Sequence, residues 1–429
     1  METQDSSQST ATSEQGIEPP KKSSKKKLWI VIAAAFLILA GVAFFVIRKG
    51  EEPTDDKGVS TSTPADENSV VAKVTIPESI LNNKFGFLSA GPGDGEFITG
   101  VGGGWVRPHP GAFVWERSQS SADAEYYYSI SDKEVARYQK DNVAILATIW
   151  PFADWDQMNN PKASSCAVSS NDEFAPGGED SKKGSKPGLD EETYGRGYLP
   201  LQRCAPTDWI AYKKWITAMV ERYDGDGIKD MAGLTMPIKH WEVMNEPDLS
   251  SPDGIDRLKF WKDTPEAYGT LLINTSEAIK AADSEAKVVI AGAAGGNNNF
   301  IGFYRSVFAN ADTIAAFDYA NVHCITSDSI DSFNVEPYKR LLAEFNINKP
   351  IWVTEAEALI SSDPDINATQ ILASTRKAIE LGAAKIFYTR YEFTNQENMM
   401  TPRGFTAPTA KTVDGSDPEA GYKNIIGQF

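Results

Sequence analysis

Two glutamates at the ends of strand-like segments are the residues of this chain best suited to chemistry. Glu246 closes the mostly apolar run 238–244 and precedes Pro247, which cannot donate a hydrogen bond to a sheet and so ends the strand. Glu355 closes a second run, 350–354. A pair of carboxylates can cleave a glycosidic bond, because one protonates the leaving oxygen while the other attacks the sugar or activates water.

The spacing of the two glutamates indicates the fold that would bring them together. They lie 109 positions apart (355 − 246). One strand–helix unit takes about 30 residues or more, so the gap fits three units. The glutamates then fall on the fourth and seventh strands of an eight-stranded barrel, at the strand ends where barrel enzymes keep their chemistry.

The rest of the chain from about residue 75 has the alternation that such a barrel needs. Strands are predicted at Phe85–Ser89, Trp105–Pro108, Val143–Ile149, Ile238–Asn245, Val288–Ala291, Tyr319–Ile325, Ile351–Glu355 and Lys385–Thr389. Helices are predicted at Asp132–Lys140, Asp208–Tyr223, Pro265–Ala282, Phe300–Ala309, Glu336–Phe345 and Ala368–Gly382. The Gly-rich segment Gly91–Gly104 is expected to be poorly helical, and a last helix, for which only Pro418–Phe429 remains, nearly absent. The pattern predicts an α/β protein with a (β/α)8 TIM barrel.

Around these glutamates the chain resembles the clan A retaining glycoside hydrolases, most of all the β-xylosidase-like family 39 and its neighbours. The similarity extends over about residues 80–400 at a low level. The motifs that carry it are Trp241-Glu242-Val243-Met244-Asn245-Glu246-Pro247-Asp248, Ile351-Trp352-Val353-Thr354-Glu355, Trp105-Val106-Arg107-Pro108 and Asn321-Val322-His323.

The resemblance implies a role for each matched polar residue. Glu246 would be the acid/base and Glu355 the nucleophile of a double displacement that needs no cofactor. Asn245 would bind the sugar 2-hydroxyl, and His323 would line the sugar site. Arg107 would bond Glu355 and hold it ionised, since an adjacent guanidinium lowers a carboxylate pKa.

Two departures from the clan pattern keep other functions open. Ile325 stands where clan members often carry a tyrosine, and the strand-eight segment 387–391 contains no tryptophan. A carbohydrate-binding protein on a catalytically degenerate barrel is therefore the alternative to a hydrolase. A cell-surface scaffold with no sugar site is a third possibility.

Aromatic side chains near predicted strand ends offer platforms for sugar rings, whose C–H faces are apolar. Trp150, at the end of the third strand, and Tyr388, on the eighth, are the candidates for substrate stacking. Core packing is the competing interpretation of both.

Asp224, Asp226 and Asp230 form a run that resembles the start of a calcium loop. The twelfth position of that loop should be a glutamate, but it is Thr235 here. A simple turn is the favoured interpretation, with calcium as a weak alternative.

The N-terminal part of the chain predicts attachment to a membrane. Residues 28–47 are twenty uncharged, mostly apolar positions, and a helix of that length spans about 30 Å, the thickness of a bilayer core. Lysines dominate the N-terminal side of this segment, which predicts an N-terminus inside the cell and an extracellular domain. We expect a disordered tail at 1–27, a single-pass anchor at 28–47, a linker at 48–74 and the barrel at 75–429. A cleaved signal peptide is the alternative.

Charge and cysteines fit an exported enzyme. The formal net charge is −17 overall and −20 beyond residue 49 (35 − 55), which disfavours nucleic acid and suits a neutral oligo- or polysaccharide. Cys166 and Cys204 lie in a long inserted loop, 157–205, where an oxidising exterior permits a disulfide. Cys324 is expected to be buried packing.

Overall fold

The computed structural model describes residues 73–88, 94–170, 172, 174–176, 199–250, 259–324, 327–357, 364–389 and 418–429. The predicted tail and anchor lie outside these residues, as do nearly all of the predicted linker and Ile325. No helix in the described part of the chain combines the length and apolar character needed to cross a bilayer.

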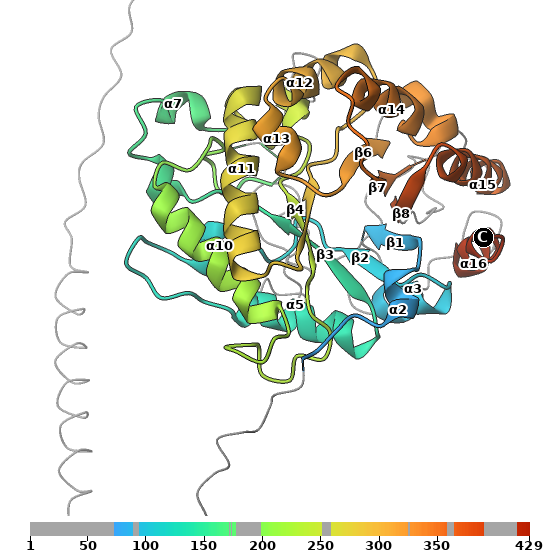
Figure 1. Cartoon of the computed structure of the whole chain (residues 1–429), viewed down its shortest axis with the longest axis horizontal. Helices are drawn as coiled ribbons and strands as arrows, with labels where there is room; N and C mark the ends of the chain where they lie inside the picture. The colour runs from blue at the N-terminus through green and yellow to red at the C-terminus, as the bar shows by residue number, and fades with distance from the viewer. Residues whose placement is uncertain are drawn as a thin grey trace, which may run out of the picture. The chain divides into compact units, whose positions relative to one another are not determined.

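Eight parallel strands form the centre of the molecule (Figure 1). They are β1 (Phe85–Leu88), β2 (Trp105–Arg107), β3 (Ala144–Ile149), β4 (His240–Val243), β5 (Lys287–Ile290), β6 (Ala320–Cys324), β7 (Ile351–Ala356) and β8 (Ala383–Thr389). Their order is β5-β4-β3-β2-β1-β8-β7-β6, and isolated parallel bridges at Val289–Tyr319 and Ala293–Val322 link the two outer strands. The sheet is thus a nearly closed barrel, and all eight predicted strands are confirmed.

Helices surround the strands (Figure 1). The longer ones are α5 (Ser129–Lys140), α10 (Trp209–Tyr223), α11 (Pro265–Ala282), α12 (Asn298–Phe308), α14 (Val335–Glu344) and α15 (Pro364–Glu380). Their starts follow from local sequence: Asp208, Thr264 and Asn297 each accept hydrogen bonds from backbone N–H groups of the first turn. Two expectations were wrong, because the Gly-rich crossover contains α3 (Asp94–Gly100) and the C-terminus forms α16 (Pro418–Ile426).

Alternation along the strands divides the core in two. Outward side chains such as Val106, Trp241 and Val353 pack in the large core between strands and helices. Inward side chains at the N-terminal end of the barrel, including Trp105 and Trp352, form a smaller apolar cluster. This cluster closes the barrel floor beneath the polar residues described below.

The long insertion after β3 is fastened to the barrel at several points. It contains α6 (Asp154–Gln157) and α7 (Ala163–Cys166), and Cys166 forms a disulfide with Cys204. Next to this bridge Arg203 makes a fully buried ion pair with Asp172. Arg203 also donates to the carbonyl of Lys259, which belongs to the connection after β4. The β3 insertion and the β4 loop are therefore held together.

Candidate active site

A buried arginine joins the polar residues at the carboxyl ends of the strands. Arg107 ends β2, is fully buried, and donates Nη1 to Glu355 at 2.7 Å and Nη2 to Oδ1 of Asn245 at 2.5 Å. Its Nε donates to Glu242 at 2.6 Å. Burial lowers the pKa of Arg107, but Glu242 and Glu355 more than offset this, so the guanidinium stays charged. The predicted contact between Arg107 and Glu355 is present.

Below these residues lies a carboxylate that sequence reasoning did not select. Glu242, on the inward face of β4, is fully buried and accepts hydrogen bonds from Arg107, Thr148, Asn321 and Thr354. A buried charge is tolerated only when it is paired and hydrogen-bonded. Here four side chains donate hydrogen bonds to the carboxylate, and one of them, Arg107, is also its ion-pair partner. An acidic residue in the middle of a predicted strand was the signal that could have found it.

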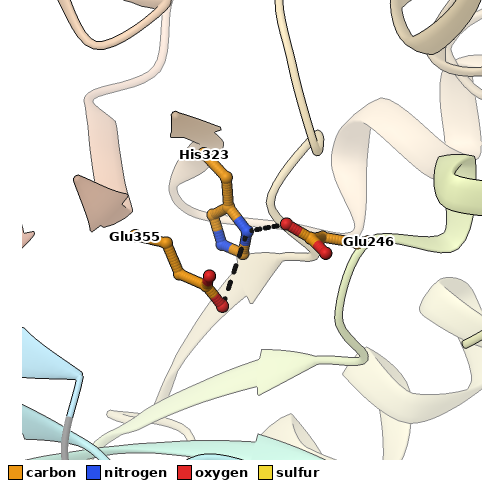
Figure 2. Close-up of side chains that lie close together, drawn as sticks. All are labelled: Glu246, His323 and Glu355. Carbon is orange, nitrogen blue, oxygen red and sulfur yellow. Dashed lines mark hydrogen bonds and ion pairs between the residues drawn. The ribbon is translucent and has the colours of Figure 1, made fainter. Parts of the chain in front are cut away.

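His323 lies between the two predicted catalytic carboxylates, and the three side chains point toward one another (Figure 2). Its Nδ1 is 2.7 Å from Oε1 of Glu246 and 3.7 Å from Oε1 of Glu355. Its Nε2 is 2.7 Å from Oγ1 of Thr354. One carboxylate oxygen of Glu246 and one of Glu355 lie within 4.8 Å of each other. The structure thus brings the two glutamates together at the mouth of the barrel.

Backbone irregularities aim these side chains. Strict alternation would send Thr354 and Glu355 to opposite faces of β7. The register with β8 shifts between Val353 and Ala356, however, and as a result the side chains of Thr354 and Glu355 both enter the site. Beyond β4, Met244 and Glu246 have φ values of 71° and 40°, in the left-handed region that side chains seldom adopt. Such backbone conformations cluster at functional sites.

The protonation of the site is governed by burial. Burial raises the pKa of Glu355 above its ordinary value; Glu246 adds to the rise, and the lowering by His323 and Arg107 does not offset it. The prediction that Arg107 would leave Glu355 with a lowered pKa is therefore wrong in its net direction. Burial also lowers the pKa of His323 to about 4, which keeps the imidazole neutral at pH 7.

A third acid lies behind Glu246. Asp248, in the short helix η1 (Pro247–Ser250), is buried, and its Oδ2 accepts the backbone N–H of Ala294 at 2.9 Å. Its Oδ1 has no hydrogen-bond partner among the residues that the structure describes. Burial, reinforced by Glu246, raises its pKa well above the usual range, which favours the neutral form of Asp248.

In the described part of the chain, two clusters have donor atoms close enough to hold a metal ion. The first is Glu246, His323 and Glu355, where the guanidinium that bonds Glu355 adds a positive charge that opposes a cation. The second is the predicted calcium candidate, Asp224, Asp226 and Asp230. These three carboxylates accept backbone N–H groups within the same turn, as the simple-turn interpretation expects. Calcium binding there stays a prediction.

The two predicted stacking aromatics lie in packed surroundings. Trp150 is fully buried, donates Nε1 to the carbonyl of Pro110, and contacts the rings of His109 and Phe260. Tyr388 points out of the barrel, where its hydroxyl bonds Thr375 of α15. Neither ring is exposed to solvent, so their positions favour the core-packing interpretation.

Comparison with solved structures reveals the same fold in sugar-cleaving enzymes. A family 39 glycoside hydrolase from the gut symbiont Bacteroides cellulosilyticus WH2 matches with a TM-score of 0.50 and 15% identity, over 82% of this chain and 65% of that one. A glucosidase from Croceicoccus marinus matches with a TM-score of 0.50 and 15% identity, over 83% and 68%. The chain shares the barrel fold of these glycosidases. At this identity the likeness concerns the fold alone, and the chain spans about two thirds of each enzyme's length. No protein-family model and no curated protein sequence matches the chain.

Proposed function

We propose that this protein is a retaining glycoside hydrolase that cleaves O-glycosidic bonds of oligo- or polysaccharides. The observation that supports it most directly is that one carboxylate oxygen of Glu246 and one of Glu355 lie within 4.8 Å of each other. Retaining enzymes hold their carboxyl groups about 5–5.5 Å apart, whereas inverting enzymes leave room for a water at about 6.5–9.5 Å. The pair therefore fits retention.

In the proposed first step Glu355 attacks the anomeric carbon while Glu246 protonates the departing oxygen. Oε1 of Glu355 is held by Arg107, which leaves Oε2 as the attacking atom. The C–O bond to the leaving group breaks as the bond to Oε2 forms. In the second step Glu246 takes a proton from water, and the hydroxide oxygen displaces Glu355 from the sugar.

Asn245 is suited to bind the sugar beside the nucleophile. Its Oδ1 accepts from Arg107, so its Nδ2 is turned away from the guanidinium and can donate to a hydroxyl of the substrate. A hydrogen bond to the 2-hydroxyl strengthens as the transition state forms. Asn245 and Arg107 thus form a unit that orders both sugar and nucleophile.

Covalent trapping tests the mechanism. The full chain is incubated with a panel of activated 2-fluoro glycosides, digested and examined by mass spectrometry. We expect one glycosyl label, on Glu355, and none in Glu355→Gln. A label on another residue, or a product with inverted anomeric configuration from a hydrolysed aryl glycoside, would refute the mechanism. Sugar binding that survives Glu355→Gln, without hydrolysis by the parent, would support the degenerate binding protein instead.

We also propose that residues 28–47 anchor the enzyme in the cell membrane as a single span, with the N-terminus inside and the barrel outside. The uninterrupted apolar segment and the preceding lysines support this arrangement. Protease added to intact cells should remove the barrel and spare the N-terminal tail. Recovery of the barrel in the medium, without residues 1–47, would favour a cleaved signal peptide.

A further inference from the structure

The hydroxyl group of Thr354 has more acceptors around it than it has protons. Its Oγ1 lies 2.9 Å from Oδ1 of Asn321, 3.1 Å from Oε1 of Glu242 and 2.7 Å from Nε2 of His323. All four side chains are fully buried, so water does not compete for these bonds. A hydroxyl donates only one hydrogen bond.

Two of the three neighbours can only accept. The orientation of Asn321 is fixed because its Nδ2 donates to Glu242 at 2.7 Å and to the carbonyl of Ile290 at 3.1 Å, which leaves Oδ1 facing Thr354. Glu242 pairs with Arg107 and accepts hydrogen bonds from Thr148 and Asn321, so its oxygens are placed as acceptors. The Thr354 proton therefore goes to Asn321 or Glu242. His323 must supply the proton for its own contact, so Nε2 is the protonated ring nitrogen.

The other ring nitrogen then determines the state of Glu246. A neutral imidazole protonated at Nε2 presents a lone pair at Nδ1, 2.7 Å from Oε1 of Glu246. A carboxylate at that distance would face a lone pair, whereas a carboxylic acid would donate a hydrogen bond to it. An imidazolium is disfavoured because the ring is fully buried.

We infer that Thr354 is a positioning residue that fixes His323 in the Nε2–H tautomer and thereby keeps a proton on Glu246 before substrate binds. The hydrogen bonds run from Glu246 through His323 to Thr354 and on to Asn321 or Glu242, each group donating to the next. The catalytic meaning of this chain of bonds rests on the proposed function, in which Glu246 must begin as an acid. The opposite tautomer would donate to Glu246 and favour its ionised form.

Nitrogen NMR reads the tautomer directly. The chain has three histidines, so the full-length protein labelled with 15N-histidine gives few signals, and His323 is assigned by its loss in His323→Asn. In the wild type at pH 7 we expect the proton of His323 on Nε2 and a lone pair on Nδ1. Thr354→Val removes the hydroxyl at nearly constant volume, and we expect a shift toward Nδ1–H. Thr354→Ser keeps the hydroxyl and should retain the wild-type spectrum.

The pH profile of hydrolysis provides a second readout. The alkaline limb of kcat/KM on a glycoside with a poor leaving group reports loss of the proton from Glu246. We expect that limb to move to lower pH by about one unit in Thr354→Val, because its acid form is no longer favoured by His323, and to be unchanged in Thr354→Ser. A substrate whose leaving group needs no protonation should show a smaller change.

A wild-type NMR spectrum in which Nδ1 of His323 carries a proton, alone or together with Nε2, would overturn the inference. So would valine and serine variants with the same tautomer and the same pH profile. If Thr354→Val does not fold, the spectra of the wild type and of Thr354→Ser still show which ring nitrogen of His323 carries the proton. A protein that shows Nε2–H but hydrolyses no glycoside would refute the proposed function and leave the hydrogen-bond assignment standing.

Discussion

Gly292 lies against His323 so closely that a Cβ at position 292 would stand 2.1 Å from Nε2 of the imidazole. Gly292 follows β5, the neighbour of the strand that carries His323. The absence of a side chain there makes room for the ring between Glu246 and Thr354.

Gly292→Ala should therefore impair catalysis. The added methyl must displace the imidazole from Glu246, and a shift of about 1 Å in an active site can cost on the order of 100-fold in rate. Measuring kcat/KM on an aryl glycoside checks this. Gly302→Ala is the matched control and should keep its activity, because on α12 the new carbon would meet no described atom within 4 Å apart from its chain neighbours and the helix's own backbone. Equal activity of the two variants would contradict the tight fit.

Glu246→Ala should slow the hydrolysis of glycosides with poor leaving groups more than that of glycosides with good ones. Without the acid, departure of a poor leaving group slows by about 10²- to 10⁴-fold, while a leaving group that departs unprotonated is much less affected in the first step. Comparing a dinitrophenyl glycoside with an alkyl glycoside of the same sugar measures the difference. A uniform loss on both substrates would remove Glu246 from the role of acid.

Glu242→Gln should destabilise the protein. The change leaves Arg107 buried with half of its charge pairing gone, and removing one partner of a buried ion pair costs about 3–5 kcal/mol. Urea unfolding measures the loss. Glu277→Gln, in an exposed pair with Lys213, should cost less than about 1 kcal/mol. A variant of Glu242 as stable as that of Glu277 would show that the buried network contributes little.

His240 makes the barrel floor sensitive to acid. Burial, with help from Lys385 and Lys287, lowers the pKa of His240 to about 3, whereas in the unfolded chain it is about 6.5. Its neutral form is packed against Trp352 and the edge of Trp105. The unfolded state takes up the proton first, so the stability contribution of His240 is full above about pH 6.5 and is lost as the pH falls toward 3.

His240→Phe removes that titration while keeping an aromatic ring. The free energy of unfolding of the wild type should fall more steeply between pH 6 and 4, by up to about 1.4 kcal/mol per pH unit relative to the variant. Urea titrations at several pH values give both slopes. Parallel slopes would mean that His240 already takes up its proton in the folded protein.

The fold was readable from sequence because apolar runs and turn residues repeat at the spacing of a barrel. Glu246 and Glu355 were found for the same reason, since each closes such a run. Glu242 was missed because its neighbours come from four other strands, which no local pattern reveals. Trp150 and Tyr388 could not be placed from the sequence for a different reason. Their positions near strand ends do not tell whether a ring faces the cleft or the helices. The irregular register of β7, which turns both Thr354 and Glu355 inward, has no sequence signature that we could identify.

The fastening of the β3 insertion by Cys166–Cys204 and by Arg203 has a consequence for maturation. Because a cystine forms only where thiols are oxidised, a chain that folds in a reducing compartment would have to secure this segment by non-covalent contacts such as those of Arg203 and Gln157. Oxidation joins the two ends of the insertion beside Arg203, which bonds the connection that follows β4, the strand that leads into Glu246. If the protein is exported, as proposed above, this bridge would form only after the chain has left the cytosol, and export would complete the covalent framework of the insertion.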